Sequence, residues 1–152
     1  RSTTLQLSDY TILAHLGQGG NATVYRAKNK ESEFALKQLK SDRSSSFKEK
    51  KQRFIDETQS VLKVQDQIHG VLPIIDYALP DAQGHYWYTM PVATPLLKQN
   101  QDLSFDEKTQ AVIELADTMA LLHARGIVHR DIKPRNLYFY EGHYCLGDFG
   151  LV

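Results

Sequence analysis

The sequence predicts an α+β fold in which five strands and one helix are followed by a mainly helical part. Short segments of alternating apolar residues crowd the first half of the chain, and the clearest helical pattern comes only after residue 104. Strands grouped before helices are typical of α+β folds, whereas a regular alternation would indicate a parallel sheet. The chain has 152 residues, of which 41% are apolar, which is enough for one core of this kind.

Five segments carry the strand pattern, at 10–16, 22–28, 33–39, 71–79 and 85–92. A glycine-rich stretch at 17–20 should join the first two, and 80–84 should form a turn between the last two. In the third segment the alternation places Lys37 on the face opposite to Phe34 and Leu36. A charged side chain is thus expected on a potentially buried face.

Two helices are expected, at 47–65 and from Ser104 onwards. Ser104 and Glu107 form a capping box at the start of the second helix, and Gly126 should end it. Its expected buried stripe comprises Val112, Leu115, Ala116, Met119, Leu122 and His123. Short strands should follow at 127–128, 137–140 and 144–147.

Composition narrows the classes of protein. The 18 basic and 18 acidic residues balance, so no bulk charge favours nucleic acid, and no apolar run is long enough for a membrane span. The single cysteine, Cys145, fits a reducing compartment and should be a packed strand residue rather than a nucleophile. We therefore expect a cytoplasmic protein with no nucleic-acid partner and no membrane span.

The glycine stretch has two equally weighted interpretations. Gly17 and Gly19 give a G-x-G pattern, but Ala22 stands where a third glycine would be expected. The segment that follows is a predicted strand, whereas a dinucleotide fingerprint needs a helix there. The stretch is then either a flap whose backbone N–H groups cover a nucleotide, or an ordinary hairpin turn.

Lys37 also has two interpretations. A lysine aimed inward beside the small Ala35 needs a partner, because burying an unpaired charge is costly. Glu57, on the first predicted helix, could be that partner, and such a pair could hold an ammonium group near phosphates. The alternative is that both are ordinary surface charges.

The densest chemistry lies in the segment His129–Asn136, which reads HRDIKPRN, and Asp148-Phe149-Gly150 comes twelve residues after Asn136. Together with Gly17–Val24, Phe34–Lys37 and Glu57, these motifs resemble the eukaryotic-type protein kinases in order and approximate spacing. The resemblance covers nearly the whole chain. It implies a protein-kinase-like fold, with an N-terminal lobe and hinge at 1–93 and the first part of the C-terminal lobe at 94–152.

The resemblance implies a serine/threonine protein kinase that transfers a phosphoryl group from Mg-ATP to a protein hydroxyl. Asp131 would accept or orient the hydroxyl proton. Lys133 would contact the transferred phosphate, and tyrosine kinases usually differ at that position, so a Ser or Thr acceptor is expected. Asn136 and Asp148 would hold Mg²⁺ through oxygen atoms, which a hard cation prefers.

The resemblance also implies an ATP site. Lys37 would neutralise phosphate charge while Glu57 fixes its position, and these two complete the expected catalytic set. Met90 would guard the back of the nucleotide pocket, and Pro91 and Val92 would belong to the hinge. The expected nucleotide-binding residues are Gly17, Gln18, Gly19, Gly20, Asn21, Val24, Ala35, Lys37, Met90, Pro91, Val92 and Tyr138.

Some features depart from the family pattern. Tyr138 stands beneath the adenine position, where an aliphatic residue is usual, and could either stack on the base or crowd it. Pro91 has no N–H, although the first hinge position normally offers its carbonyl. The chain ends at Val152, directly after Asp-Phe-Gly, so we expect a fragment of a longer protein that is inactive alone.

Two other functions were weighed against the kinase. A non-catalytic, pseudokinase-like nucleotide-binding or scaffolding module is favoured by the early end of the chain and by Tyr138. Lys37, Asp131, Asn136 and Asp148 speak against it. A small-molecule kinase of the same broad fold ranks lower, because such enzymes commonly lack the Lys133 pattern and the Asp-Phe-Gly motif.

Overall fold

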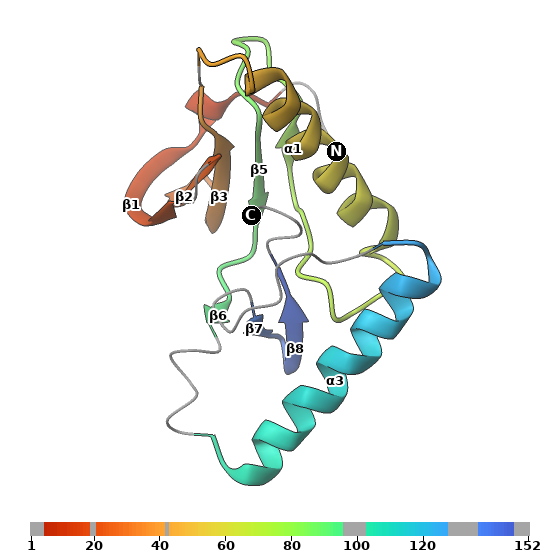
Figure 1. Ribbon diagram of the computed structural model, residues 1–152. Coiled ribbons are helices and arrows are strands. Elements are labelled where there is room, and N and C mark those ends of the chain that lie inside the picture. The colour runs from red at the N-terminus through yellow and green to blue at the C-terminus, as the bar shows by residue number, and fades with distance from the viewer. Residues whose placement is uncertain (1–4, 19–20, 42, 96–102, 128–136, 148–152) are drawn as a thin grey trace. The chain divides into compact units, whose positions relative to one another are not determined.

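The computed structural model describes residues 5–18, 21–41, 43–95, 103–127 and 137–147 (Figure 1). The chain forms two compact units. The first contains Arg1–Gln59 and Pro73–Val92, and the second contains Ser60–Leu72 and Ala93–Val152.

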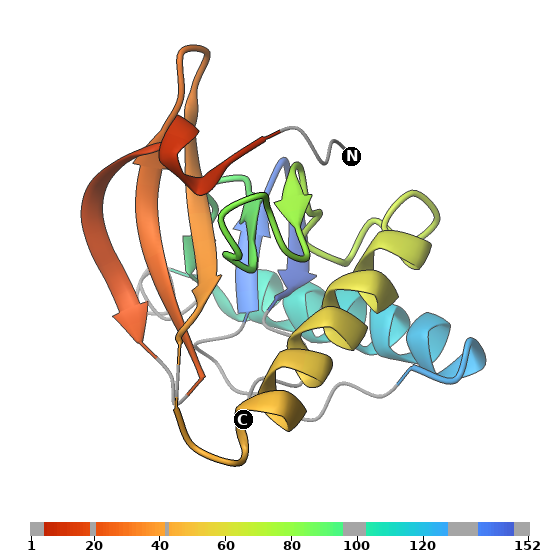
Figure 2. The same cartoon turned by 90° about the horizontal axis from the view of Figure 1, so that it is seen from above.

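The first unit is built on a five-stranded antiparallel sheet in the order β1-β2-β3-β5-β4. Its elements are the 3-10 helix η1 (Leu7–Asp9), β1 (Thr11–Gln18), β2 (Ala22–Lys28), β3 (Glu33–Leu39), α1 (Phe47–Val64), β4 (Tyr77–Ala78) and β5 (Trp87–Met90). The first three strands lie side by side and curve together (Figure 2). The five strands and the helix between the third and fourth are confirmed.

β4 and β5 are shorter than predicted. Pro73 has no N–H to donate to a sheet ladder, and the expected strand at 71–79 is reduced to Tyr77–Ala78. In the segment predicted as the next strand, the N–H of His85 donates to the side chain of Asp81 instead of a strand partner. Pro91 follows the last residue of β5 and also lacks the N–H that would extend it.

One face of this sheet carries an apolar core, here called the aromatic face. Its buried residues are Tyr10, Ala27, Phe34, Leu36, Ala78 and Trp87. The Tyr10 ring meets the rings of Phe34 and Trp87 edge to face, with centroids 6.0 and 5.2 Å apart. Aromatic pairs of this geometry add to the stabilisation from buried area.

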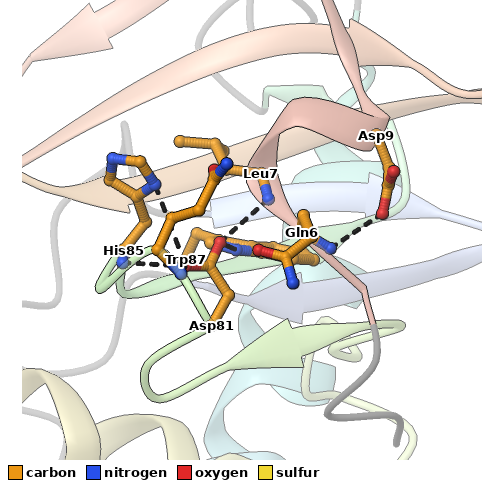
Figure 3. Close-up of polar contacts among 7 residues, drawn as sticks. Gln6, Leu7, Asp9, Asp81, His85 and Trp87 are labelled. Carbon is orange, nitrogen blue, oxygen red and sulfur yellow. Dashed lines mark hydrogen bonds and ion pairs between the residues drawn. The ribbon is translucent and has the colours of Figure 1, made fainter.

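Asp81 seals the aromatic face from the turn between β4 and β5 (Figure 3). Its fully buried carboxylate accepts hydrogen bonds from Trp87 Nε1 at 3.0 Å and from the backbone N–H of Leu7 at 2.9 Å. The N–H groups of Gln83 and His85 donate to its other oxygen. Burial disfavours the charged form, but these four hydrogen bonds outweigh it and lower the pKa of Asp81.

The buried hydroxyl of Tyr10 donates to the Asp76 carboxylate, with 3.4 Å between the oxygens. Burial and the negative charge of Asp76 raise the pKa of Tyr10 to about 12. Tyr10 is therefore neutral and donating throughout the physiological range.

The second unit contains a three-stranded sheet, β6-β7-β8, and the helix α3 (Phe105–Ala124). Its strands are β6 (Thr94–Pro95), β7 (Leu137–Tyr140) and β8 (His143–Leu146). The β7–β8 hairpin was predicted, with Glu141 and Gly142 at positive φ as a two-residue turn requires. β6 was not predicted, and Ile127 is not in a strand as expected, because its N–H bonds back to Leu122.

Both predicted ends of α3 are confirmed. Ser104 and Glu107 form the reciprocal capping box. Gly126, at φ +74°, follows the last residues of the helix, and its N–H donates to His123. With the bond from Ile127 to Leu122, this is a Schellman ending, which places glycine at the left-handed position.

The predicted buried stripe of α3 is wrong. Ala111, Thr118 and Leu122 are its buried residues, whereas Val112 is 67% exposed. Of the other stripe residues, Leu115 and Met119 are half-buried, and Ala116 and His123 are exposed. The small Ala111 and Thr118 allow a close approach, since a Cβ on Gly70 would overlap the Thr118 side chain. The buried face is set by this contact rather than by the apolar pattern.

Cys145 is buried on β8, as predicted. Its thiol lies near the carbonyl oxygens of His69 and His143, at 3.7 and 3.8 Å. Burial, together with the negative charge of Glu114, raises the pKa of Cys145 to about 11. The thiolate is therefore disfavoured, which agrees with a packed residue rather than a nucleophile.

Candidate functional site

The strand register brings four residues from four strands into one row. Gly17 of β1 pairs with Val24 of β2, Val24 pairs with Lys37 of β3, and Lys37 pairs with Tyr88 of β5. Directly paired residues of antiparallel strands point to the same face of a sheet. Three residues predicted from separate motifs, Gly17, Val24 and Lys37, therefore share one face.

A second row adds to this face. Ala35, two residues before Lys37 on β3, pairs with Met90 of β5. Both side chains are buried. Gly17, Val24, Ala35, Lys37 and Met90 are here called the lysine face, and the alternation of β3 puts it opposite to the aromatic face. The predicted placement of Lys37 opposite to Phe34 and Leu36 is confirmed.

Lys37 is only 3% exposed. An ammonium group is rarely buried to this degree unless it is paired, because leaving water is costly for a charge. The interpretation of Lys37 as an ordinary surface charge is therefore wrong. A buried cation on a sheet face next to the short side chain of Ala35 can neutralise an anionic group such as a phosphate.

Helix α1 presents Glu57 toward the same side of the sheet. The Phe54 ring of α1 contacts the ring of Tyr88, which shares the row of Lys37, with centroids 5.6 Å apart. Glu57 comes three residues after Phe54 and lies on the same helical face. Thr58 is buried there and donates to the carbonyl of Phe54. Glu57 itself is half-buried.

The other predicted nucleotide-binding residues differ in accessibility. Gln18 and Val92 are exposed, Asn21 and Tyr138 are half-buried, and Pro91 is buried. The carbonyl of Asn21 accepts the N–H of Lys40 at 2.9 Å, which fixes the backbone at the start of β2. Tyr138 lies on β7 and pairs with Pro95 and Cys145.

Part of the predicted site lies outside the described residues. Gly19, Gly20, Asp131, Lys133, Asn136 and Asp148 belong to this group. Within the described ranges, no group of three His, Cys, Asp or Glu side chains is arranged to hold a metal ion. The described part of the chain likewise has no helix of the length and apolarity needed to cross a membrane.

The sequence interpretation missed two residues at this site. Tyr88 joins the row of Lys37 and meets α1, and the alternation within 85–92 could have placed it there. Gly147 touches Tyr138, as described below, and no local pattern marks that contact.

Comparison with known proteins decides the family. The sequence matches the protein kinase domain family over residues 10–152, almost its whole length. The chain belongs to the protein kinase domain family. The lysine face and α1 are thus parts of a kinase domain, and the α+β, kinase-like fold with its five-stranded sheet is confirmed.

Named relatives of this kinase domain are serine/threonine kinases. The chain is 31% identical over 163 residues to the DNA damage-responsive serine/threonine-protein kinase RqkA of Deinococcus radiodurans, covering 98% of this chain and 23% of the relative. It is 33% identical over 154 residues to Aurora kinase B of Xenopus tropicalis, covering 95% of this chain and 41% of the relative. The kinase domain therefore spans less than half the length of these relatives.

A solved structure has the same fold. The kinase domain of PknI from M. tuberculosis superposes with a TM-score of 0.71 at 24% identity, over 100% of this chain and 62% of that chain. This likeness confirms the fold.

Proposed function

We propose that the protein carrying this kinase domain is an ATP-dependent serine/threonine protein kinase. The observation that supports the proposal most is the lysine face, which joins a glycine of the β1–β2 hairpin to a 3% exposed lysine on β3. A buried ammonium group beside small side chains suits a nucleotide whose phosphates need a cation and whose flat base needs room. Named relatives with serine/threonine kinase titles support the choice of acceptor.

The roles inside the site follow from chemistry. Lys37 binds the phosphates of ATP, and Glu57 holds the ammonium group in position. Asn136 and Asp148 supply oxygen ligands for Mg²⁺, whose charge neutralises the phosphates. Asp131 receives the hydroxyl proton and Lys133 contacts the moving phosphoryl group.

Adenine binding is assigned to the remaining residues. Val24 and Ala35 cover one side of the base, and Tyr138 covers the other. Met90 closes the back, and Pro91 and Val92 offer backbone groups to the base edge, with Pro91 contributing only its carbonyl. Backbone N–H groups of Gly17, Gln18, Gly19, Gly20 and Asn21 cover the phosphates.

The lobe assignment and the setting are part of the same proposal. Residues 1–93 form the N-terminal lobe and hinge, and residues 94–152 begin the C-terminal lobe. The partners are ATP, Mg²⁺ and a protein with an acceptor Ser or Thr, and nucleic acid is not a partner. The enzyme works in the cytoplasm.

The test is transfer of labelled γ-phosphate by the full-length protein to itself and to a generic protein substrate in the presence of Mg²⁺. Wild type should label serine or threonine, and Asp131→Asn should lose the transfer. An exposed aspartate, Asp66, gives the matched control Asp66→Asn, which should keep it. Equal transfer by wild type and Asp131→Asn would sink the proposal.

A non-catalytic nucleotide-binding module is the second candidate, because Tyr138 brings a bulky ring to a position proposed to adjoin the base. It predicts that ATP raises the melting temperature equally with and without Mg²⁺, and that no phosphate is transferred. Magnesium-dependent stabilisation together with transfer excludes it.

A further inference from the structure

Tyr138 and Gly147 are neighbours across the β7–β8 hairpin. Tyr138 pairs directly with Cys145, and Gly147 comes two residues after Cys145, directly beyond the end of β8. Residues two apart on a strand point to the same side, so Gly147 is the diagonal neighbour of Tyr138. No sequence motif would have joined these two positions.

The ring of Tyr138 fills the space that a side chain on Gly147 would need. A Cβ atom on Gly147 would lie 2.8 Å from Cε1 and 3.1 Å from Cδ1 of Tyr138. On its other side it would meet Cδ2 of Leu72 at 3.7 Å. Carbon atoms in good contact are about 3.5–4.0 Å apart, so even alanine requires the tyrosine ring to move.

The ring cannot move as a long flexible side chain would. A tyrosine has only two rotatable side-chain bonds, and Tyr138 is held between the strand partners Pro95 and Cys145. The sizes of the two side chains are therefore coupled. A large residue at 138 requires glycine at 147, and a smaller residue at 138 would release that requirement.

Tyr138 is half-buried, so part of its ring remains accessible. We propose that Tyr138 and Gly147 act together as a specificity-determining pair, in which Gly147 lets the Tyr138 ring lie where the purine base of ATP stacks on it. This inference rests on the kinase function proposed above. Aromatic rings stack on nucleic-acid bases with a useful gain in affinity, whereas an aliphatic residue offers only dispersion contacts.

The experiment is a double-mutant cycle in the full-length protein, with Tyr138→Leu, Gly147→Ala, the double variant and Tyr138→Phe. The dissociation constant for Mg-ATP is measured by calorimetry, and the melting temperature is measured without nucleotide. We expect Tyr138→Leu to weaken binding by about tenfold and Tyr138→Phe to leave it unchanged, because phenylalanine keeps the stacking face.

Gly147→Ala should weaken ATP binding and lower the melting temperature in the wild-type background, but should do neither when combined with Tyr138→Leu. Additive losses in both measurements would overturn the coupling. Unchanged affinity in Tyr138→Leu would overturn the stacking while leaving the kinase function standing. A wild type that binds no ATP would contradict the kinase function and the stacking, and the melting temperatures would still decide the coupling.

Discussion

The two faces of the five-stranded sheet are both buried at β3, yet they are built from different chemistry. The aromatic face joins Tyr10, Phe34 and Trp87 and is sealed by the fully hydrogen-bonded carboxylate of Asp81. The lysine face carries small or slender side chains around the ammonium group of Lys37. An apolar residue would suit the position of Lys37 better if stability alone mattered. The difference indicates that one face serves folding and the other serves a ligand.

Trp87→Ala should have the largest effect on the aromatic face. Trp87 is fully buried in contact with Tyr10, and truncating such a residue costs about 3–5 kcal/mol of unfolding free energy. Urea unfolding of the full-length protein measures the loss. If the faces are separate, phosphoryl transfer per folded molecule persists; a stability change below about 1 kcal/mol would show that this face is not the core.

Asp81→Asn should destabilise by about 1.5–3 kcal/mol, because an amide cannot accept all the hydrogen bonds that the carboxylate accepts. The exposed residue Asp66 provides the control Asp66→Asn, which should change little.

The same variant has a pH signature. The pKa of Asp81 is lowered in the folded protein, so its contribution is present above the pKa of the unfolded chain, about 3.9, and is lost as pH falls through the folded value. Wild type should therefore lose stability in acid more steeply than Asp81→Asn. Parallel curves of melting temperature against pH would contradict this role for the carboxylate.

Tyr10→Phe should have the smallest effect, about 0.5–1.5 kcal/mol, because only the hydrogen bond to Asp76 is lost. The pKa of Tyr10 is raised to about 12 from 10.0, so its contribution is complete below pH 10 and disappears as pH rises through 12. Alkaline unfolding of wild type should flatten in Tyr10→Phe. An unchanged alkaline limb would show that another group titrates there.

Local patterns predicted the parts of the fold that depend on near neighbours. The alternation in β2 and β3 gave both strands their observed bounds, and the capping box and Gly126 gave both ends of α3. The buried face of α3 was wrong because Thr118 meets Gly70, a contact between residues far apart in sequence. β6 and the shortened β4 were missed for similar reasons.

The candidate site shows the same limit. The pairing of Val24 with Lys37 follows from one hairpin, so the sequence could indicate it. The pairing of Ala35 with Met90, and the acceptor role of Asp81 in what was predicted as a plain turn, depend on contacts between distant segments. Physical pattern reached the first kind of contact and could not reach the second.

The most direct test of the lysine face is Lys37→Met, measured for both phosphoryl transfer and unfolding free energy. The matched control is Lys30→Met, which makes the same change at an exposed turn. We expect Lys37→Met to lower transfer by about 10²–10³-fold, as removal of one electrostatic contact to the transition state does, with no loss of stability. Full transfer by Lys37→Met, or unfolding without any specific loss of transfer, would contradict the assignment of this face to ATP.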